Sequence, residues 1–78
     1  MILLHIISPN GTILKKEVEE VYMSGVDGPF TVLDGHAPMI AALREGVIKF
    51  KINDNVESIE VGSGFAEIED DYIKVCVD

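Results

Sequence analysis

Residues typical of turns interrupt this chain at short intervals and leave only short apolar segments between them. The segments are rich in Ile and Val, whose branched side chains favour strands, and the interruptions hold Gly, Pro, Asn and Asp. Short strands separated by turns roughly every 8 to 12 residues are typical of a β-sandwich or a small barrel. We therefore predict an all-β protein, a small β-sandwich of about eight to ten short strands in a single domain over residues 1–78.

Val47 to Ile52 is the clearest predicted strand. Ile48 and Phe50 alternate with lysines, which places the apolar side chains on one face and the charges on the other. The turn Asn53-Asp54-Asn55 follows and predicts a hairpin with the segment that ends at Val61.

Three other segments are less regular. Val18 to Met23 is predicted as one strand, with a bulge near Glu19-Glu20 that would restore its alternation. Ile13-Leu14 is expected to pair only briefly. Pro38 could open a helix over Met39 to Leu43, but the segment is short and we expect it to be extended.

The composition excludes several classes of function. The chain has 14 acidic and 6 basic side chains and a formal net charge of −8, so nucleic acids and anionic lipid headgroups would repel it. The single cysteine, Cys76, allows no internal disulfide. No segment approaches the roughly 20 apolar residues of a membrane-spanning helix, and no basic region precedes the apolar residues Met1 to Ile7 as in a signal peptide. We expect no nucleic acid partner and no direct membrane insertion.

Gly25 to Gly46 is the least regular stretch, and we expect it to be the contact surface. Two of the three prolines and four of the seven glycines lie there, grouped around Asp27-Gly28-Pro29 and Asp34-Gly35. Such turns lie at the surface, where binding residues are common. His36 follows the second turn and is either a contact residue or a residue that pins the turn by a hydrogen bond.

Candidate sites for chemistry are weak. Gly62-Ser63-Gly64 follows a predicted strand, but a dinucleotide fingerprint needs another glycine, where Glu67 stands, and then a helix. His5 and His36 with a single cysteine do not form a zinc set, and no serine lies in a nucleophile elbow. We expect no catalytic residue, no metal and no cofactor.

The stretch from Gly25 to Met39, which includes Gly28-Pro29-Phe30 and Asp34-Gly35-His36-Ala37-Pro38, resembles the signature stretch of the epsilon subunit of F-type rotary ATP synthases. Ile7 to Gly11 and Val61 to Ile68 resemble further segments of that family, so the resemblance covers essentially the whole chain. The fold of the family is a flattened β-sandwich, which agrees with the strand prediction.

The resemblance implies a non-catalytic subunit of the central stalk, or rotor, of a proton- or sodium-driven ATP synthase. Such a subunit links the gamma shaft to the membrane c-ring and transmits torque. The implied c-ring contacts are Gly28, Pro29, Phe30, Asp34, Gly35 and His36. The implied gamma contacts are Ser8, Pro38, Met39, Ile40 and Ala41. At position 34 the family usually has proline or a similar residue, so Asp34 adds a charge to the implied c-ring surface.

The family usually carries a C-terminal helical hairpin after the sandwich, whereas this chain stops at Asp78. We therefore expect no inhibition of ATP hydrolysis by this chain. The resemblance also implies a peripheral position on the cytoplasmic face of the bacterial inner membrane, held by partner subunits, and no homo-oligomer.

Two other functions stay open. One is a free-standing β-sandwich that binds a ligand, although two Tyr and three Phe are the whole aromatic supply and no calcium loop is present. The other is a small hydrolase that uses His36 with Asp34.

Overall fold

The computed structural model describes residues 1–78 and consists of nine strands joined by short turns. The strands are β1 (Ile2–Ser8), β2 (Gly11–Val18), β3 (Glu20–Gly25), β4 (Gly28–Leu33), β5 (Met39–Leu43), β6 (Gly46–Ile52), β7 (Asn55–Val61), β8 (Gly64–Ile68) and β9 (Tyr72–Val77). No helix is present that is long and apolar enough to cross a membrane. The all-β prediction and its strand number are confirmed.

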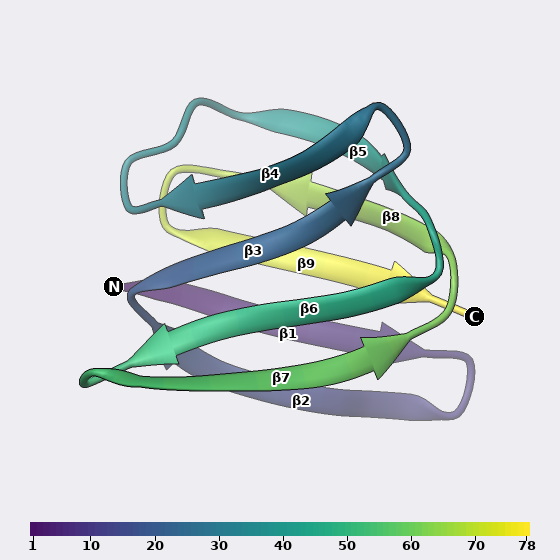
Figure 1. The fold of residues 1–78 in the computed structure, drawn as a ribbon, viewed down its shortest axis with the longest axis horizontal. Helices are drawn as coiled ribbons and strands as arrows, with labels where there is room; N and C mark the ends of the chain where they lie inside the picture. Colours follow the sequence, from purple (N-terminus) through teal and green to yellow (C-terminus); the bar gives the residue numbers. More distant parts are fainter.

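The strands form two layers that face each other (Figure 1). The first layer has the order β2-β1-β9-β8-β5, and the second has the order β4-β3-β6-β7. All pairings are antiparallel except β1 with β9. The layers are joined where the end of β3 meets the end of β5, through the single pair Gly25 and Leu43. The molecule measures 28 × 22 × 18 Å, which fits a flattened sandwich.

The core between the layers is almost entirely aliphatic. Sixteen hydrophobic residues are buried, Phe50 is the only aromatic one among them, and no polar or charged side chain is buried. Each fully buried Val, Leu or Ile contributes about 1.5–3 kcal/mol relative to an exposed one. The alternation predicted for Val47 to Ile52 is confirmed, since Ile48 and Phe50 are buried and Lys49 is exposed.

The prediction of one bulged strand from Val18 to Met23 is wrong. Val18 ends β2 in the first layer, and Glu20 begins β3 in the second layer. The chain turns at Glu19, whose N–H donates to the carbonyl of Lys51 over 2.8 Å. Val18 and Val21 are both fully buried because the corner resets the alternation.

β2 is also longer than expected. Ile13-Leu14 belongs to an eight-residue strand that pairs with β1 along its whole length. The segment escaped prediction because it forms an edge of the sheet, where six of its eight residues are exposed and no alternation is required. The register shift of this pair lies between Ile6 and Ile7, not near Glu19.

The turn chemistry read from the sequence is confirmed in two places. Asn53 and Asp54 have φ of 47° and 68° and form the two-residue loop between β6 and β7, as the primed hairpin turns require. Gly62-Ser63-Gly64 is a corner between β7 and β8, with no helix to receive a phosphate. A Cβ atom at position 64 would overlap the carbonyl of Cys76, so only glycine fits there. Met39 to Leu43 is extended, as predicted.

Candidate partner-binding surfaces

The hairpin between β3 and β4 carries the first group of predicted contact residues. Gly25 pairs with Gly28, so Val26 and Asp27 form the tip. Gly28 has φ of +125°, a conformation that side chains rarely adopt. Pro29 follows and is exposed, while the ring of Phe30 is half-buried.

A hollow of about 150 Å³ lies between this hairpin and β5. It is lined by Gly25, Asp27, Gly28, Phe30, Met39, Ile40, Ala41 and Ala42. Residues that the sequence assigned to two different partners therefore lie side by side. Ile40 is 74% exposed and Met39 is 40% exposed, which makes the rim of the hollow apolar and accessible. Pro38 directly precedes β5 and is also exposed.

The turn at Asp34-Gly35-His36 lies at the opposite end of β4 from the hairpin tip. A six-residue strand spans roughly 17–20 Å, so the two predicted c-ring turns are separated by that length. The N–H of His36 donates to the carbonyl of Leu33 over 3.2 Å, and the N–H of Gly35 donates to the carbonyl of Asp70 over 3.3 Å. Gly35 has φ of +80°, which favours glycine.

His36 makes a hydrogen bond within its own turn. Its Nδ1–H donates to the carbonyl oxygen of Ala37 over 2.6 Å, which supports the reading of His36 as a turn-pinning residue. The carboxylate of Asp34 instead contacts the α-amino group of Met1 at 2.8 Å. His36 and Asp34 therefore do not form the hydrogen-bonded pair that a hydrolase would use.

The ion pair of Met1 with Asp34 alters the electrostatics of this turn. The hydrogen bond from the α-amino group, and then its charge, lower the pKa of the Asp34 carboxyl. The same two interactions raise the pKa of the α-amino group. Asp34 thus adds less net charge to the turn than the sequence suggested, because a cation lies directly beside it.

Ser8 lies apart from the other predicted gamma contacts. Its hydroxyl donates to the carbonyl of Gly11 over 3.3 Å and accepts the N–H of Asn10 over 3.2 Å, within the β1–β2 turn. β9 and β8 separate β1 from β5. The structure therefore does not bring Ser8 next to Pro38 or to the residues of β5.

A row of apolar side chains nevertheless crosses the outer face of the first layer between these places. Ile7 lies opposite Cys76, Cys76 opposite Phe65, and Phe65 opposite Ala42. We call these four residues the apolar strip. Phe65 is 48% exposed. The strip begins beside Ser8 and ends beside Ala41. The apolar strip was not predicted from the sequence, because the pairing of strands distant in the chain decides which side chains become neighbours.

Arg44 is a further residue whose part in these surfaces was not predicted from the sequence. Its Nη2 donates to the carbonyl of Val26 over 3.3 Å, and its backbone N–H donates to the carbonyl of Ser24 over 3.0 Å. The N–H of Val26 donates to the carbonyl of Ala42 over 2.9 Å. These three bonds tie the tip of the hairpin to the end of β5 and hold the two sides of the hollow in one arrangement.

No group of three or more His, Cys, Asp and Glu side chains in this chain is arranged to hold a metal ion. The two turns, the rim of Met39 and Ile40 and the apolar strip are surfaces suited to protein contact, since exposed apolar patches bordered by polar residues mark such sites. The fold and these surfaces define a small β-sandwich module with exposed surfaces suited to protein contact.

The chain belongs to the family described as the ATP synthase, Delta/Epsilon chain, beta-sandwich domain, whose model matches residues 1–78. It is 37% identical over 75 residues to an ATP synthase epsilon chain of Desulfitobacterium hafniense, covering 96% of this chain and 57% of that protein. An ATP synthase epsilon chain of Magnetococcus marinus is 39% identical over 75 residues, with 96% and 55% covered. The chain thus spans somewhat more than half the length of these relatives.

Two solved structures share the fold. A chain in the mitochondrial ATP synthase of Euglena gracilis, a complex of OSCP, F1 and c-ring, matches with a TM-score of 0.90 and 23% identity over 97% of this chain and 49% of its own length. A chain in the central stalk and c-ring structure of the Tetrahymena thermophila mitochondrial ATP synthase matches with a TM-score of 0.79 and 10% identity, covering 97% of this chain and 62% of that chain.

Proposed function

We propose that this chain is a non-catalytic subunit of the central stalk of an ATP synthase and links the gamma shaft to the c-ring. Membership of the delta/epsilon family supports the assignment, and so does the naming of its relatives as ATP synthase epsilon chains. The structural observation that supports it most is the hydrogen-bonded joint of the β3–β4 hairpin with β5, which joins the two groups of predicted contact residues in one small domain.

The c-ring contact is proposed along β4, an edge strand that pairs only with β3. Both predicted turns lie on that edge, with Gly28-Pro29-Phe30 at one end and Asp34-Gly35-His36 at the other. A partner that touches both must present a surface at least roughly 17–20 Å long. A ring of repeated loops offers such a surface.

The gamma contact is proposed on the outer face of the first layer. Ile40 pairs with Glu67 and shares the outer face with the apolar strip, whereas Met39 and Ala41 pair with the buried Ile68 and Ala66 and line the hollow beside the hairpin. Pro38 precedes β5 at this end of the strip, and Ser8 follows Ile7 at the other end. The strip makes one continuous apolar surface between residues that are otherwise three strands apart. Stable interfaces have an apolar core with a polar rim, and the strip with its polar neighbours fits that pattern.

The proposed location follows from the proposed partners. The subunit is a peripheral part of a membrane-associated complex, on the cytoplasmic face of the bacterial inner membrane. With a net charge of −8, the chain would be repelled by anionic lipid headgroups. The partner subunits must therefore hold it at the membrane.

Phe65→Glu tests the gamma contact, because it places a charge in the middle of the apolar strip without disturbing a buried residue. We expect the amount of this chain that co-purifies with gamma to fall by about tenfold or more. Ser58→Glu, an exposed position on β7 in the other layer, adds the same charge and should leave co-purification unchanged. Retention of the Phe65→Glu variant at the wild-type level would refute the proposed gamma surface. If the wild-type chain itself does not associate with gamma, a free-standing ligand-binding module becomes the better reading.

A further inference from the structure

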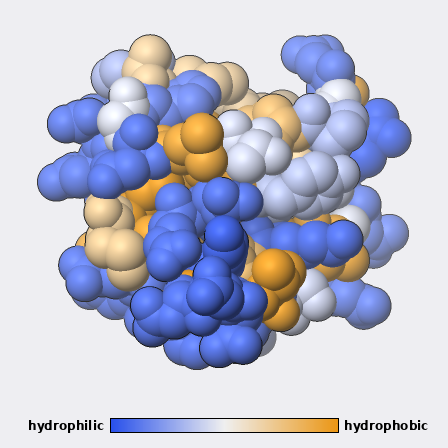
Figure 2. Space-filling model, turned by 60° about the vertical axis from the view of Figure 1, so that its left-hand side comes forward, coloured by the Kyte–Doolittle hydropathy of each residue, from blue (hydrophilic) through white to orange (hydrophobic).

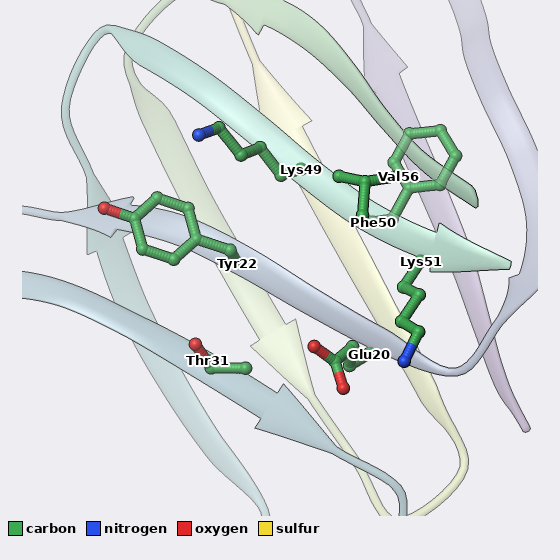
Figure 3. A pocket seen from close by; sticks show the side chains of 7 residues that line it. All are labelled: Glu20, Tyr22, Thr31, Lys49, Phe50, Lys51 and Val56. Carbon is green, nitrogen blue, oxygen red and sulfur yellow. The ribbon is translucent and has the colours of Figure 1, made fainter. Parts of the chain in front are cut away.

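A shallow hollow of about 210 Å³ lies on the outer face of the second layer, away from the apolar strip. It is lined by Glu20, Tyr22, Thr31, Lys49, Lys51 and Val56, above the buried ring of Phe50. Glu20 and Lys51 are half-buried, and the other four side chains are exposed. The register of β3 with β6 creates it, since Tyr22 lies opposite Lys49 and Glu20 lies opposite Lys51. Figure 3 shows these side chains, which come from three neighbouring strands and from the start of β7.

Lys49 and Lys51 are two of only six basic side chains in a chain of net charge −8. The ion pairs of the molecule join Met1 to Asp34 and Lys16 to Glu57, so neither of these lysines is ion-paired. The Nζ of Lys49 lies 5.8 Å from the centre of the Tyr22 ring, within the range of a cation–π contact. An incoming carboxylate would therefore find two ammonium groups without having to displace an existing ion pair.

The hollow also has an apolar part. Val56 is 66% exposed and Tyr22 is 37% exposed. Leu33, which lies opposite Glu20 in the register of β3 with β4, is 56% exposed. Basic and apolar groups thus lie within a few residues of one another on a single sheet face.

We propose that this hollow is a docking surface for an acidic protein segment that carries an apolar side chain between its carboxylates. The two ammonium groups would bind carboxylates, and Tyr22 with Val56 would cover the apolar side chain. The hollow is open, and only side chains line its cationic part, so it lacks the converging backbone N–H groups that hold a small free anion. It is a third surface, centred on β3 and β6, which borders the proposed c-ring surface at Thr31 of β4, and it stands whether or not the proposed function is correct.

The net charge of the chain favours an acidic protein segment over an anionic membrane as the partner of this hollow. A lipid surface faces the complete molecule, whose net charge of −8 opposes contact. A short segment interacts only within the Debye length of about 8 Å at physiological salt. At that range the charges nearest to it are the two lysines, Glu20, and Glu19, whose N–H donates to the carbonyl of Lys51.

The test is a titration of the isotopically labelled chain, followed by amide NMR shifts, with a five-residue peptide that has one leucine between two pairs of glutamates. We expect shifts at Tyr22, Thr31, Lys49 and Lys51. The double variant Lys49→Gln with Lys51→Gln should weaken binding by about fivefold or more. Glu20→Gln should tighten binding by about twofold, because it removes the like charge from the hollow.

The matched control is Lys15→Gln with Lys74→Gln, which removes two exposed charges from the first layer and should change the affinity by less than about twofold. Equal weakening by this control would overturn the proposal, since binding would then follow net charge alone. Equal binding of a peptide with glutamine in place of glutamate would also overturn it. So would an absence of shifts at millimolar peptide, or binding to phosphatidylserine vesicles in place of the peptide.

Discussion

At the scale of single residues, the strictest requirement in the chain is a glycine at position 64. A side chain there would run into the Cys76 carbonyl of the neighbouring strand, which is fixed by the pairing of β8 with β9. We expect Gly64→Ala to lower the free energy of unfolding by about 3 kcal/mol, because the backbone of one strand must move. Urea unfolding measures the loss.

Gly62→Ala is the matched control for that substitution. Its Cβ atom would lie no closer than 3.4 Å to any neighbour, the carbonyl of Asp78, so we expect a change within about 1 kcal/mol. If the two variants have the same stability, the close approach of Gly64 to Cys76 does not constrain the fold as argued.

A second residue-scale prediction concerns the ion pair of Asp34 with the α-amino group of Met1. The pKa of the carboxyl is lowered, so its contribution to stability is present above the ordinary carboxyl pKa and is lost as the pH falls through the folded-state value. The pKa of the amine is raised, so its contribution is present below the ordinary amine pKa and is lost as the pH rises through the folded-state value. The stabilisation is therefore greatest between about pH 4 and pH 8.

Asp34→Asn should remove this contribution. The difference in urea midpoint between wild type and variant should be largest inside that pH window and shrink on both sides. Acetylation of the α-amino group should reproduce the effect of the substitution, and acetylating the variant should add nothing further. A difference that stays constant from pH 3 to pH 9 would show that the pair has another role.

At the scale of elements, the joint between the β3–β4 hairpin and β5 sets the shape of the proposed contact region. Arg44 is its only side-chain bond, from Nη2 to the carbonyl of Val26. We expect Arg44→Gln to speed amide hydrogen exchange at Val26 by about three- to tenfold, because the tip opens more often. Exchange at Ile48, in the core, should not change. Lys15→Gln is the control, because it removes a similar charge from β2, and exchange at Val26 should not change in that variant. If exchange at Val26 is also unchanged in Arg44→Gln, the Arg44 bond does not order the tip.

The same elements show what a sequence can and cannot predict. Val47 to Ile52 and Tyr72 to Val77 were predictable, because each has one buried face and alternation must follow. The corner at Glu19 was not predictable, because in the sequence a corner and a bulge interrupt the alternation of apolar residues in the same way. The turns at Gly28 and Gly35 were predictable from their Gly, Pro and Asp residues, but the meeting of the hairpin with β5 was not, because β5 pairs with β8, which is distant in the chain.

At the scale of the whole molecule, negative charge gathers in the end turns. The hydrogen bond of Gly35 to Asp70 places Asp34 beside the turn that contains Glu69, Asp70 and Asp71. Figure 2 turns this end forward and shows hydrophilic residues over most of it, with smaller hydrophobic areas between them. The net charge of −8 is therefore unevenly distributed, with several acidic groups close together at this end.

Added salt has two opposing effects on the stability of the fold, because it screens both the repulsion among the acidic groups and the attraction within the ion pairs. The Debye length is about 30 Å at 0.01 M salt and about 8 Å at 0.15 M, while the longest dimension of the molecule is 28 Å. At low salt the acidic groups thus repel one another across the whole body, and added salt removes that repulsion. Salt also weakens the two ion pairs, but both are exposed to solvent, which already screens their attraction.

We therefore expect the urea midpoint to rise as sodium chloride increases from about 0.01 to 0.15 M, because repulsion among the excess acids outweighs two exposed ion pairs. Potassium chloride should give the same rise at equal ionic strength, since screening does not depend on the cation. Lys16→Gln removes one ion pair and raises the net negative charge, so the rise with salt should be steeper in that variant. A midpoint that falls as salt is added would mean that the ion pairs, and not the excess of acidic groups, dominate the electrostatics of the fold.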